Sequence, residues 1–492
     1  MEHSTGKIVK NTIVFTIALL MQKAIAFVNF LFLSSRLSPE TLGAYIWALS
    51  FTTMFSIGAD LGLSFIMMRD VAKDDRDDEG YFQNILGLKL PLVLLTLTVC
   101  LITLFATKHD SQTIALVLVA SALMIFDAIT VVFYSFLRAK QYLTYEAIGV
   151  VGFQFIAFCG TVFSLFTGRG IIYVMAALAL AGLINLVYSA IAFRKKFKYP
   201  FRPRFDSGTF KYLFKLMPVF ALSGIFVRIY NASDSVILGY LRDNAAVGLF
   251  SVPAKIVTAF QALIPGVFTA TVYPAMSNFY VTSKEKLQIL FEKSFNYLSL
   301  ISVPVAFGLY AIAEPVLRLI WPRYIEALWT FKIMALALPF VFLAFPTGLL
   351  LRACDRQNIN TINRGVITAL SVILNVILIY YYGVLGAGIT FFIVNAILLA
   401  ADFIYVGKIV GYSAKNILIY NAKVLISGLI MMLVVDISLS SASLYLSIAA
   451  GAATFFITAL IMRLIAKQDI KYLRAMLKIK KTQDAGQAFN NN

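Results

Sequence analysis

Long apolar runs separated by short polar breaks follow one another along almost the whole chain. Most reach the length of about 20 residues that an apolar helix needs to cross the hydrocarbon core of a bilayer. Several contain Pro or Gly, which packed membrane helices tolerate, and none alternates over about ten residues as a barrel strand does. The pattern predicts an all-α polytopic membrane protein. We count fourteen runs, at 11–36, 41–68, 82–107, 113–137, 147–166, 171–193, 216–241, 248–276, 289–313, 325–350, 362–382, 386–407, 416–435 and 443–465.

Landmarks in this pattern occur twice. They return at similar offsets and at corresponding places among the runs, which indicates a duplicated bundle. Duplicated halves are typical of transporters, because two repeats can rock about a shared central site. The landmarks are the triplet Leu-Arg-Ala at 137–139 and 351–353, Gly168 and Gly383, and Gly43 and Gly248, at offsets of 214, 215 and 205.

The duplication predicts two pseudo-symmetric six-helix bundles with two further helices at the C-terminal end. The longest polar break, between the sixth and seventh runs, carries eight Lys and Arg and two Pro. We interpret it as a linker held at the anionic inner surface of the membrane. The predicted segments are 1–193 for the first bundle, 194–215 for the basic cytoplasmic linker, 216–410 for the second bundle, 411–465 for helices 13 and 14, and 466–492 for a basic cytoplasmic tail.

Composition and charge agree with this class. The chain is 60% hydrophobic and 13% charged, far from the quarter charged that is usual in soluble domains. If the N-terminus is cytoplasmic, 28 of the 42 Lys and Arg fall in cytoplasmic segments and six on the opposite side. This bias predicts a protein of the inner (cytoplasmic) membrane with both termini in the cytoplasm. The first run has no cleavage site of small residues after it, so we expect it to remain as a membrane helix. The net charge of +18 is spread over loops, which disfavours a nucleic-acid partner.

The chain offers little for metal, cofactor or enzyme chemistry. Its three Cys and two His are isolated, without metal-ligand spacing. No phosphate-binding GxxxxGK[ST] loop occurs, which argues against an ATP-driven pump in one polypeptide. The acidic stretch 74–79 contains the Asp-x-Asp spacing of some metal sites, but a solvated loop is the simpler interpretation. We expect no cofactor, no metal and no enzymatic activity.

Charged residues inside the runs are the best functional candidates, because each costs about 2.5–3.5 kcal/mol or more at the bilayer centre. Those within about two turns of a cytoplasmic end can reach the surface, and a structural role is favoured for them. Lys332, near the outer end of the tenth run, is ambiguous. The residues near an end are Lys89, Lys293, Lys423, Asp402 and Glu146; the deep set is Lys23, Asp60, Asp127, Arg228, Asp234 and Lys255.

Alignment of the two repeats shows which of these charged residues occupy equivalent positions. An offset of 205 places Lys23 on Arg228, both near the middle of the first helix of their half, and Asn29 on Asp234. Two cations facing a shared cavity would suit an anionic group such as a phosphate or pyrophosphate. The alternative is that both cations form structural ion pairs with Asp60, Asp127 or Asp234.

Several stretches resemble polysaccharide flippases of the Wzx type, in the superfamily that includes the lipid II flippase MurJ and the MATE exporters. Each stretch is weak by itself, whereas their order and spacing are more specific, and the resemblance covers about residues 8–465. The stretches are Asn-Ala-Ser-Asp-Ser-Val-Ile-Leu-Gly at 231–239, Val-Gly-Leu-Phe at 247–250, Leu-Gly-Ala-Tyr at 42–45, Asp-Leu-Gly-Leu at 60–63, Tyr-Pro at 273–274, Glu-Pro-Val-Leu at 314–317 and Gly-Val-Leu-Gly-Ala at 383–387.

The resemblance implies two bundles arranged as a V and a polyprenyl-pyrophosphate-linked oligosaccharide as substrate, turned from the inner to the outer leaflet for surface polysaccharide such as O-antigen. A proton or sodium gradient would drive the movement. Polymerases and glycosyltransferases of the same pathway would be partners. Lys23, Arg228 and Lys255 would then contact the substrate. Asp60, Asp127 and Asp234 would couple ions or set the charge state of these cations.

Two other functions stay open. A MATE-like exporter of cationic drugs would share the fold, but we would expect acidic rather than cationic deep residues in its pore. A polytopic glycan polymerase or ligase usually needs a large outer loop, and the longest outer break here is about 314–324. Both are retained as alternatives to the flippase hypothesis.

Overall fold

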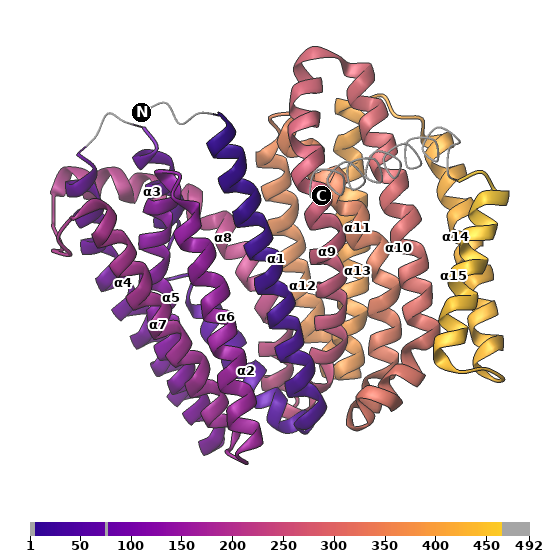
Figure 1. Ribbon diagram of the computed structural model, residues 1–492, viewed down its shortest axis with the longest axis horizontal. Helices are drawn as coiled ribbons and strands as arrows, with labels where there is room; N and C mark the ends of the chain where they lie inside the picture. Colours follow the sequence, from indigo (N-terminus) through magenta and orange to yellow (C-terminus); the bar gives the residue numbers. More distant parts are fainter. Residues whose placement is uncertain (1–4, 74–76, 465–492) are drawn as a thin grey trace, which may run out of the picture.

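The computed structural model describes residues 5–73 and 77–464. The described part is helical, with fifteen α-helices and one short 3₁₀ helix and no strand, so the predicted all-helical membrane fold is confirmed (Figure 1). The predicted tail at 466–492 lies outside the described residues. The elements are α1 (Thr5–Arg36), α2 (Pro39–Phe55), α3 (Leu63–Val71), α4 (Asp78–Ala106), α5 (Ser111–Ala139), α6 (Leu143–Phe166), α7 (Ile171–Phe197), α8 (Ser207–Leu241), α9 (Asn244–Thr282), α10 (Lys284–Ile320), η1 (Pro322–Ala327), α11 (Leu328–Ala353), α12 (Gln357–Tyr382), α13 (Val384–Ile409), α14 (Ala414–Leu439) and α15 (Leu444–Ile461).

Every apolar run coincides with helix, but two runs are not simple spans. Among the described helices, twelve are long and apolar enough to cross a membrane. The run at 41–68 is broken, because α2 ends at Phe55 and α3 begins at Leu63. The run at 216–241 lies within α8, which bends by 45° between its parts Ser207–Pro218 and Phe220–Leu241. Pro218 lacks the backbone N–H of an ordinary helical residue, which accounts for a bend at this point.

The repeated landmarks share features of backbone conformation in both halves. Helices α5 and α11 both end in Leu-Arg-Ala, and two residues later Gln141 and Asp355 have positive φ of 62° and 56°. In each turn the next backbone N–H donates to the carbonyl of the Leu at 2.8 Å. Gly168 and Gly383 also have positive φ, 67° and 59°, which glycine adopts without strain. The repeat therefore preserves the form of the turn after Leu-Arg-Ala and the positive φ of the glycine.

Helices α1–α7 lie on one side of the molecule and α9–α13 on the other, with α14 and α15 at the outer edge (Figure 1). The two bundles meet where α2 crosses α9. At this crossing a Cβ on Gly43 would lie 1.6 Å from the carbonyl oxygen of Asn244, and a Cβ on Gly248 would lie 1.9 Å from that of Pro39. The two repeated glycines thus let both backbones touch.

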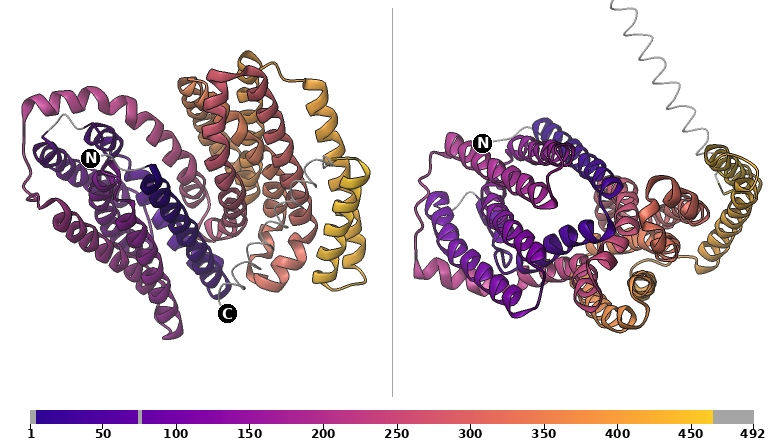
Figure 2. Two further views of the ribbon diagram at one scale, coloured as in Figure 1. Left: turned by 45° about the horizontal axis from the view of Figure 1, so that its top comes forward. Right: turned by 90° about the horizontal axis from the view of Figure 1, so that it is seen from below.

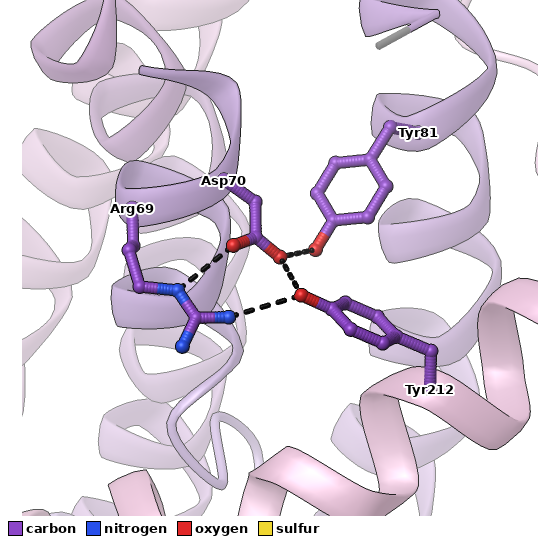
Figure 3. Close-up of polar contacts among 4 residues, drawn as sticks. All are labelled: Arg69, Asp70, Tyr81 and Tyr212. Carbon is purple, nitrogen blue, oxygen red and sulfur yellow. Dashed lines mark hydrogen bonds and ion pairs between the residues drawn. The ribbon is translucent and has the colours of Figure 1, made fainter. Parts of the chain in front are cut away.

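The N-terminal part of α8 crosses one end of the first bundle (Figure 2) and is bound to it by buried polar contacts. Asp70, at the end of α3, accepts hydrogen bonds from Arg69 Nε at 2.8 Å and from the hydroxyls of Tyr81 and Tyr212 at 2.9 Å each (Figure 3). The backbone N–H of Asp206 donates to Asn84 Oδ1 at 2.7 Å. The segment predicted as a linker therefore packs against α3 and α4.

We predict that Gly43→Ala and Gly248→Ala each lower the free energy of unfolding by at least about 2 kcal/mol, because the new methyl group must force two backbones apart. The midpoint of thermal unfolding in detergent measures the change. Gly152→Ala, on α6, is the control. A Cβ there has no atom within 4 Å, so unfolding should be unchanged or shifted slightly upward. Equal midpoints for all three variants would contradict the prediction.

Candidate functional site

A cavity of about 480 Å³ lies between the two bundles, beside the crossing of α2 and α9. Its walls come from α2 of the first bundle and from α8, α9, α11, α12 and α13 of the second. The lining combines aliphatic and aromatic side chains with polar and charged ones. Its charged residues are Asp234, Lys255 and Arg364, and its uncharged polar residues include Ser50, Thr53, Asn231, Gln261 and Asn395.

Two cations face this cavity without a hydrogen-bond acceptor among the described residues. The ammonium of Lys255 lies 5.9 Å from the ring centroid of Phe30. The guanidinium of Arg364 lies beside Gly348, with one Nη 3.4 Å from the position of a Cβ there. Arg352 approaches the same glycine and donates from Nε to its carbonyl oxygen at 3.2 Å. The positive charge in the cavity is thus available to a ligand.

One acid lines the cavity together with the two cations. Asp234 Oδ1 accepts a hydrogen bond from Asn375 Nδ2 at 2.5 Å, and no Lys or Arg forms an ion pair with Asp234 in the described part of the chain. The side-chain carbonyl oxygen of Asn375 is buried and has no described partner. A turn earlier on α8, the Tyr230 hydroxyl accepts from Asn395 Nδ2 at 3.1 Å.

A second charged cluster lies at the break between α2 and α3. Leu61 and Gly62 have φ of 42° and 80° there, and a Cβ on Gly62 would lie 2.7 Å from the Cβ of Phe220. The break presents Asp60, which accepts from Lys89 Nζ and from Ser64 Oγ at 2.5 Å each. A glycine is required where the turn is left-handed and α8 passes this close.

Arg228 completes this cluster. Its guanidinium donates to Ser56 Oγ and interacts electrostatically with Asp60 and Asp127. Of these charges, Lys89 and Asp60 form an ion pair at the break, whereas Arg228 acts on both acids from beyond ion-pair distance. Among the described residues Arg228 forms no ion pair with Asp60, Asp127 or Asp234, so its contact with substrate and the ion-pair alternative both stay predictions.

The structure separates the predicted site residues into groups. Lys255 and Asp234 line the cavity, whereas Asp60 lies at the break between α2 and α3 with Arg228 bound to Ser56 beside it. Asp127, on α5, is influenced electrostatically by Arg228. Lys23 is exposed on α1 and has no hydrogen-bond or ion-pair partner among the described residues. Neither Lys23 nor Arg228 lines the cavity. The two cations that the repeat aligns do not face one another in it.

Residues near helix ends also differ from expectation. Lys89 and Asp402, which we expected to reach the surface, are completely buried. Lys89 pairs with Asp60 in the break between α2 and α3, and nothing in the sequence indicated this pairing. Lys293 and Lys423 are exposed, as expected. Arg364 lies just inside the eleventh run, and only its place in the cavity distinguishes it from other basic residues near helix ends.

No metal centre is formed by the described residues. Within 5–73 and 77–464, no group of three or more His, Cys, Asp or Glu gathers as a metal site would require.

The loop residue His109 packs against Trp47, with ring centroids 4.5 Å apart, and burial lowers the pKa of its imidazole. Of the acidic stretch at 74–79, residues 74–76 lie outside the described part, and Asp78 pairs with Lys140 at 2.7 Å.

A second cavity, of about 620 Å³, lies between α10, α11, α13 and α14. Its lining is almost entirely apolar and includes Phe295, Phe307, Phe340, Phe392, Phe403 and Leu418. It differs from the first cavity in having no charged residue in its lining.

We predict that Asp60→Ala lowers the free energy of unfolding by about 3–5 kcal/mol, because it leaves Lys89 buried without a counter-charge. The double variant Asp60→Ala/Lys89→Met should recover part of this loss. Thermal unfolding in detergent measures both. Glu314→Ala is the control, since its pair with Arg318 is exposed and worth at most about 1 kcal/mol. A double variant less stable than Asp60→Ala would refute the buried-pair interpretation.

The chain was compared with known families and solved structures. Residues 8–280 match the model of a family described as polysaccharide biosynthesis protein. No curated protein sequence matches the chain. The lipid II flippase MurJ, in an inward closed conformation, has a TM-score of 0.75 at 16% identity over 92% of this chain and 99% of its own. An inward-facing multidrug resistance MATE family transporter has a TM-score of 0.61 at 16% identity over 80% of this chain and 96% of its own.

A further similar solved structure is described by the polarity of its binding pocket. It is a MOP superfamily transporter from Pyrococcus furiosus, with a TM-score of 0.54 at 15% identity over 81% of this chain and 94% of its own. It is described as having a binding pocket of reverse polarity that suggests a different function. At these identities the similarities show the fold. With the family match over more than half of the chain, they confirm the resemblance inferred from the motifs: the chain belongs to the polysaccharide biosynthesis protein family.

Proposed function

We propose that this protein is a flippase that moves polyprenyl-pyrophosphate-linked oligosaccharides from the cytoplasmic to the outer leaflet for surface polysaccharide synthesis. The proposal rests on the cavity between the bundles, where Lys255 and Arg364 have no hydrogen-bond acceptor or ion-pair partner among the described residues. A diphosphate is the anion that such cations would hold, and Arg can do so with two parallel hydrogen bonds. The family and the fold support the same function.

The amphipathic substrate explains why two chemically different cavities serve one protein. A sugar diphosphate cannot cross hydrocarbon unaided, because buried charge without partners is very costly. The cationic cavity would carry this head group as the two bundles rock. The polyprenyl chain can stay in apolar surroundings, and the apolar cavity between α10, α11, α13 and α14 offers them inside the protein.

The remaining predicted residues take distinct places in this proposal. Asp60 pairs with Lys89 at the break, and Asp60 and Asp127 would together set the charge state of Arg228. Asp234, which lines the cavity with no cation paired to it, is the candidate for coupling to an ion gradient. Lys23 and Arg228 lie outside the cavity and would contact the substrate in another arrangement of the two bundles.

The distribution of Lys and Arg supports the rest of the setting. We propose an inner-membrane location with both termini cytoplasmic, so that the linker and the first part of α8 lie at the cytoplasmic surface. The substrate is made by glycosyltransferases on that side, and a polymerase uses it on the other. These enzymes are the proposed pathway partners, and the protein itself has a transport rather than an enzymatic role.

The alternatives fit the structure less well. A MATE-like exporter of cationic drugs would need net negative charge in its cavity, whereas this one has two cations and one acid. A glycan polymerase or ligase needs an outer domain for its chemistry. Between α10 and α11 the described chain forms only the short helix η1. Pocket polarity is also the property by which the Pyrococcus furiosus transporter is set apart within this fold.

Complementation tests the function directly. In a strain lacking its own repeat-unit flippase but supplied with the cognate glycosyltransferases, the chain should restore surface polysaccharide and remove the accumulated lipid-linked saccharides. It should leave resistance to cationic drugs unchanged in an exporter-deficient strain. Drug resistance without polysaccharide would favour the exporter instead.

We predict that Lys255→Ala and Arg364→Ala each reduce flipping about tenfold or more at unchanged protein levels. Each removes a charge-assisted hydrogen bond to the diphosphate worth about 1.5–3 kcal/mol. The rate of appearance of surface polysaccharide measures the loss. Arg318→Ala, an exposed cation outside the cavity, should behave as the parent protein. Wild-type rates in both cavity variants would disprove the assigned head-group site.

A further inference from the structure

Asp402, on α13, is a buried carboxyl group that the proposed transport function does not use. It is 0% exposed and lies between α11, α12 and α13. Its Oδ1 accepts a hydrogen bond from Asn363 Nδ2 at 2.9 Å, and its Oδ2 accepts one from Thr347 Oγ1 at 3.1 Å. Both partners are neutral and are themselves buried. The carboxyl group is thus held in place by donors that carry no charge.

No Lys or Arg nitrogen of the described residues lies within ion-pair distance of Asp402. Two acids of the first half differ, since Asp60 pairs with Lys89 and the buried Glu146 pairs with Arg138. A carboxylate buried without a counter-charge raises the free energy of the protein, and binding a proton removes this cost. The two hydrogen bonds stabilise the ionised carboxylate, so the group can still release its proton. Such a group is suited to exchanging a proton, which is the usual role of acids inside membrane bundles.

Neighbouring residues of α12 contact this acid and line the cavity. Asn363, which binds Asp402, is followed in the chain by Arg364, which lines the cavity. Arg364 interacts electrostatically with Asp402 from beyond ion-pair distance. Among the charged side chains on the helices packed around α13, Arg364 is the one whose charge acts on Asp402. Other titratable or charged groups on α13 and on the helices packed against it include Arg228, Tyr230, Asp234, Lys255, Glu292, Lys293, Lys332, Arg352 and Lys408.

We propose that Asp402 is a proton-binding site coupled through Arg364 to anion binding in the cavity. An anion held by Arg364 offsets the positive charge that favours the ionised carboxylate, so a proton from water adds to a carboxylate oxygen. When the anion leaves, the proton returns to water. By thermodynamic linkage, a proton on Asp402 strengthens anion binding by the same factor. The inference rests on the proposed function, in which the anion is the substrate diphosphate.

Proton uptake on ligand binding tests this coupling. Full-length protein in weakly buffered detergent is titrated with inorganic pyrophosphate in the presence of a pH indicator. We expect the wild type to take up more protons per bound pyrophosphate than Asp402→Asn, with a difference approaching one. Proton exchange by the ligand itself cancels in this difference. Glu146→Gln, which removes a buried acid that has a cation partner, should match the wild type. Equal uptake by the wild type and Asp402→Asn, with both binding pyrophosphate, would overturn the inference.

Infrared spectroscopy tests the same site without a ligand. As the pH is lowered, the wild type should gain the carbonyl stretch of a neutral carboxyl group, which Asp402→Asn lacks and Glu146→Gln retains. Asp402→Glu, which keeps the carboxyl group but moves it, should shift the band and serves if the amide variant does not fold. If wild-type protein fails to bind pyrophosphate, the proposed anion site is wrong. The pH titration by infrared spectroscopy would still show whether Asp402 binds a proton. The absence of any band assignable to Asp402 would overturn the proposed proton-binding site.

Discussion

The fold depends on a reciprocal backbone contact where α2 crosses α9. Gly43 and Gly248 occupy equivalent places in the two repeats, and each lies against the carbonyl of a residue in the opposite half. Small residues permit this approach in a membrane, where packing rather than the hydrophobic effect drives helix association. Beside the contact, Trp47 Nε1 donates to the carbonyl oxygen of Val236 at 3.3 Å. The contact holds the bundles together at one line and leaves the cavity beside it.

The two halves share this frame but manage charge differently. In the first half Asp60 has Lys89 as a counter-ion. In the second half Asp234 and Asp402 are bound by amide or hydroxyl donors alone. The offset of the repeat places Pro265 opposite Asp60, so the broken and charged α2–α3 has a long α9 as its counterpart. The repeated helices allow the two bundles to rock against each other. The charged residues differ between the halves, so the two bundles have different chemistry.

Helix α8 connects the two halves: its first part is bound to the first bundle, and it then bends toward the second. Buried contacts of Asp70 with Tyr81 and Tyr212 hold the first part of α8 on the first bundle. The bend at Pro218–Phe220 then lets the rest of α8 enter the second bundle and line the cavity. A single helix thereby links the basic surface segment to Arg228 and Asp234. Movement of one bundle against the other would act through this bend.

Sequence alone determined the helices, because each apolar run of sufficient length must form its backbone hydrogen bonds internally in lipid. It also located the repeat, whose glycines and helix ends have conformations that few residues tolerate, and it placed Lys255 and Asp234 among the deep charges. It did not reveal the break after Phe55, the partner of Lys89 or the place of Arg364 and Asp402. Hydropathy measures how apolar a segment is, whereas the partner of a charge depends on which helices meet. Only tertiary packing decided that, because the interacting residues lie tens to hundreds of positions apart.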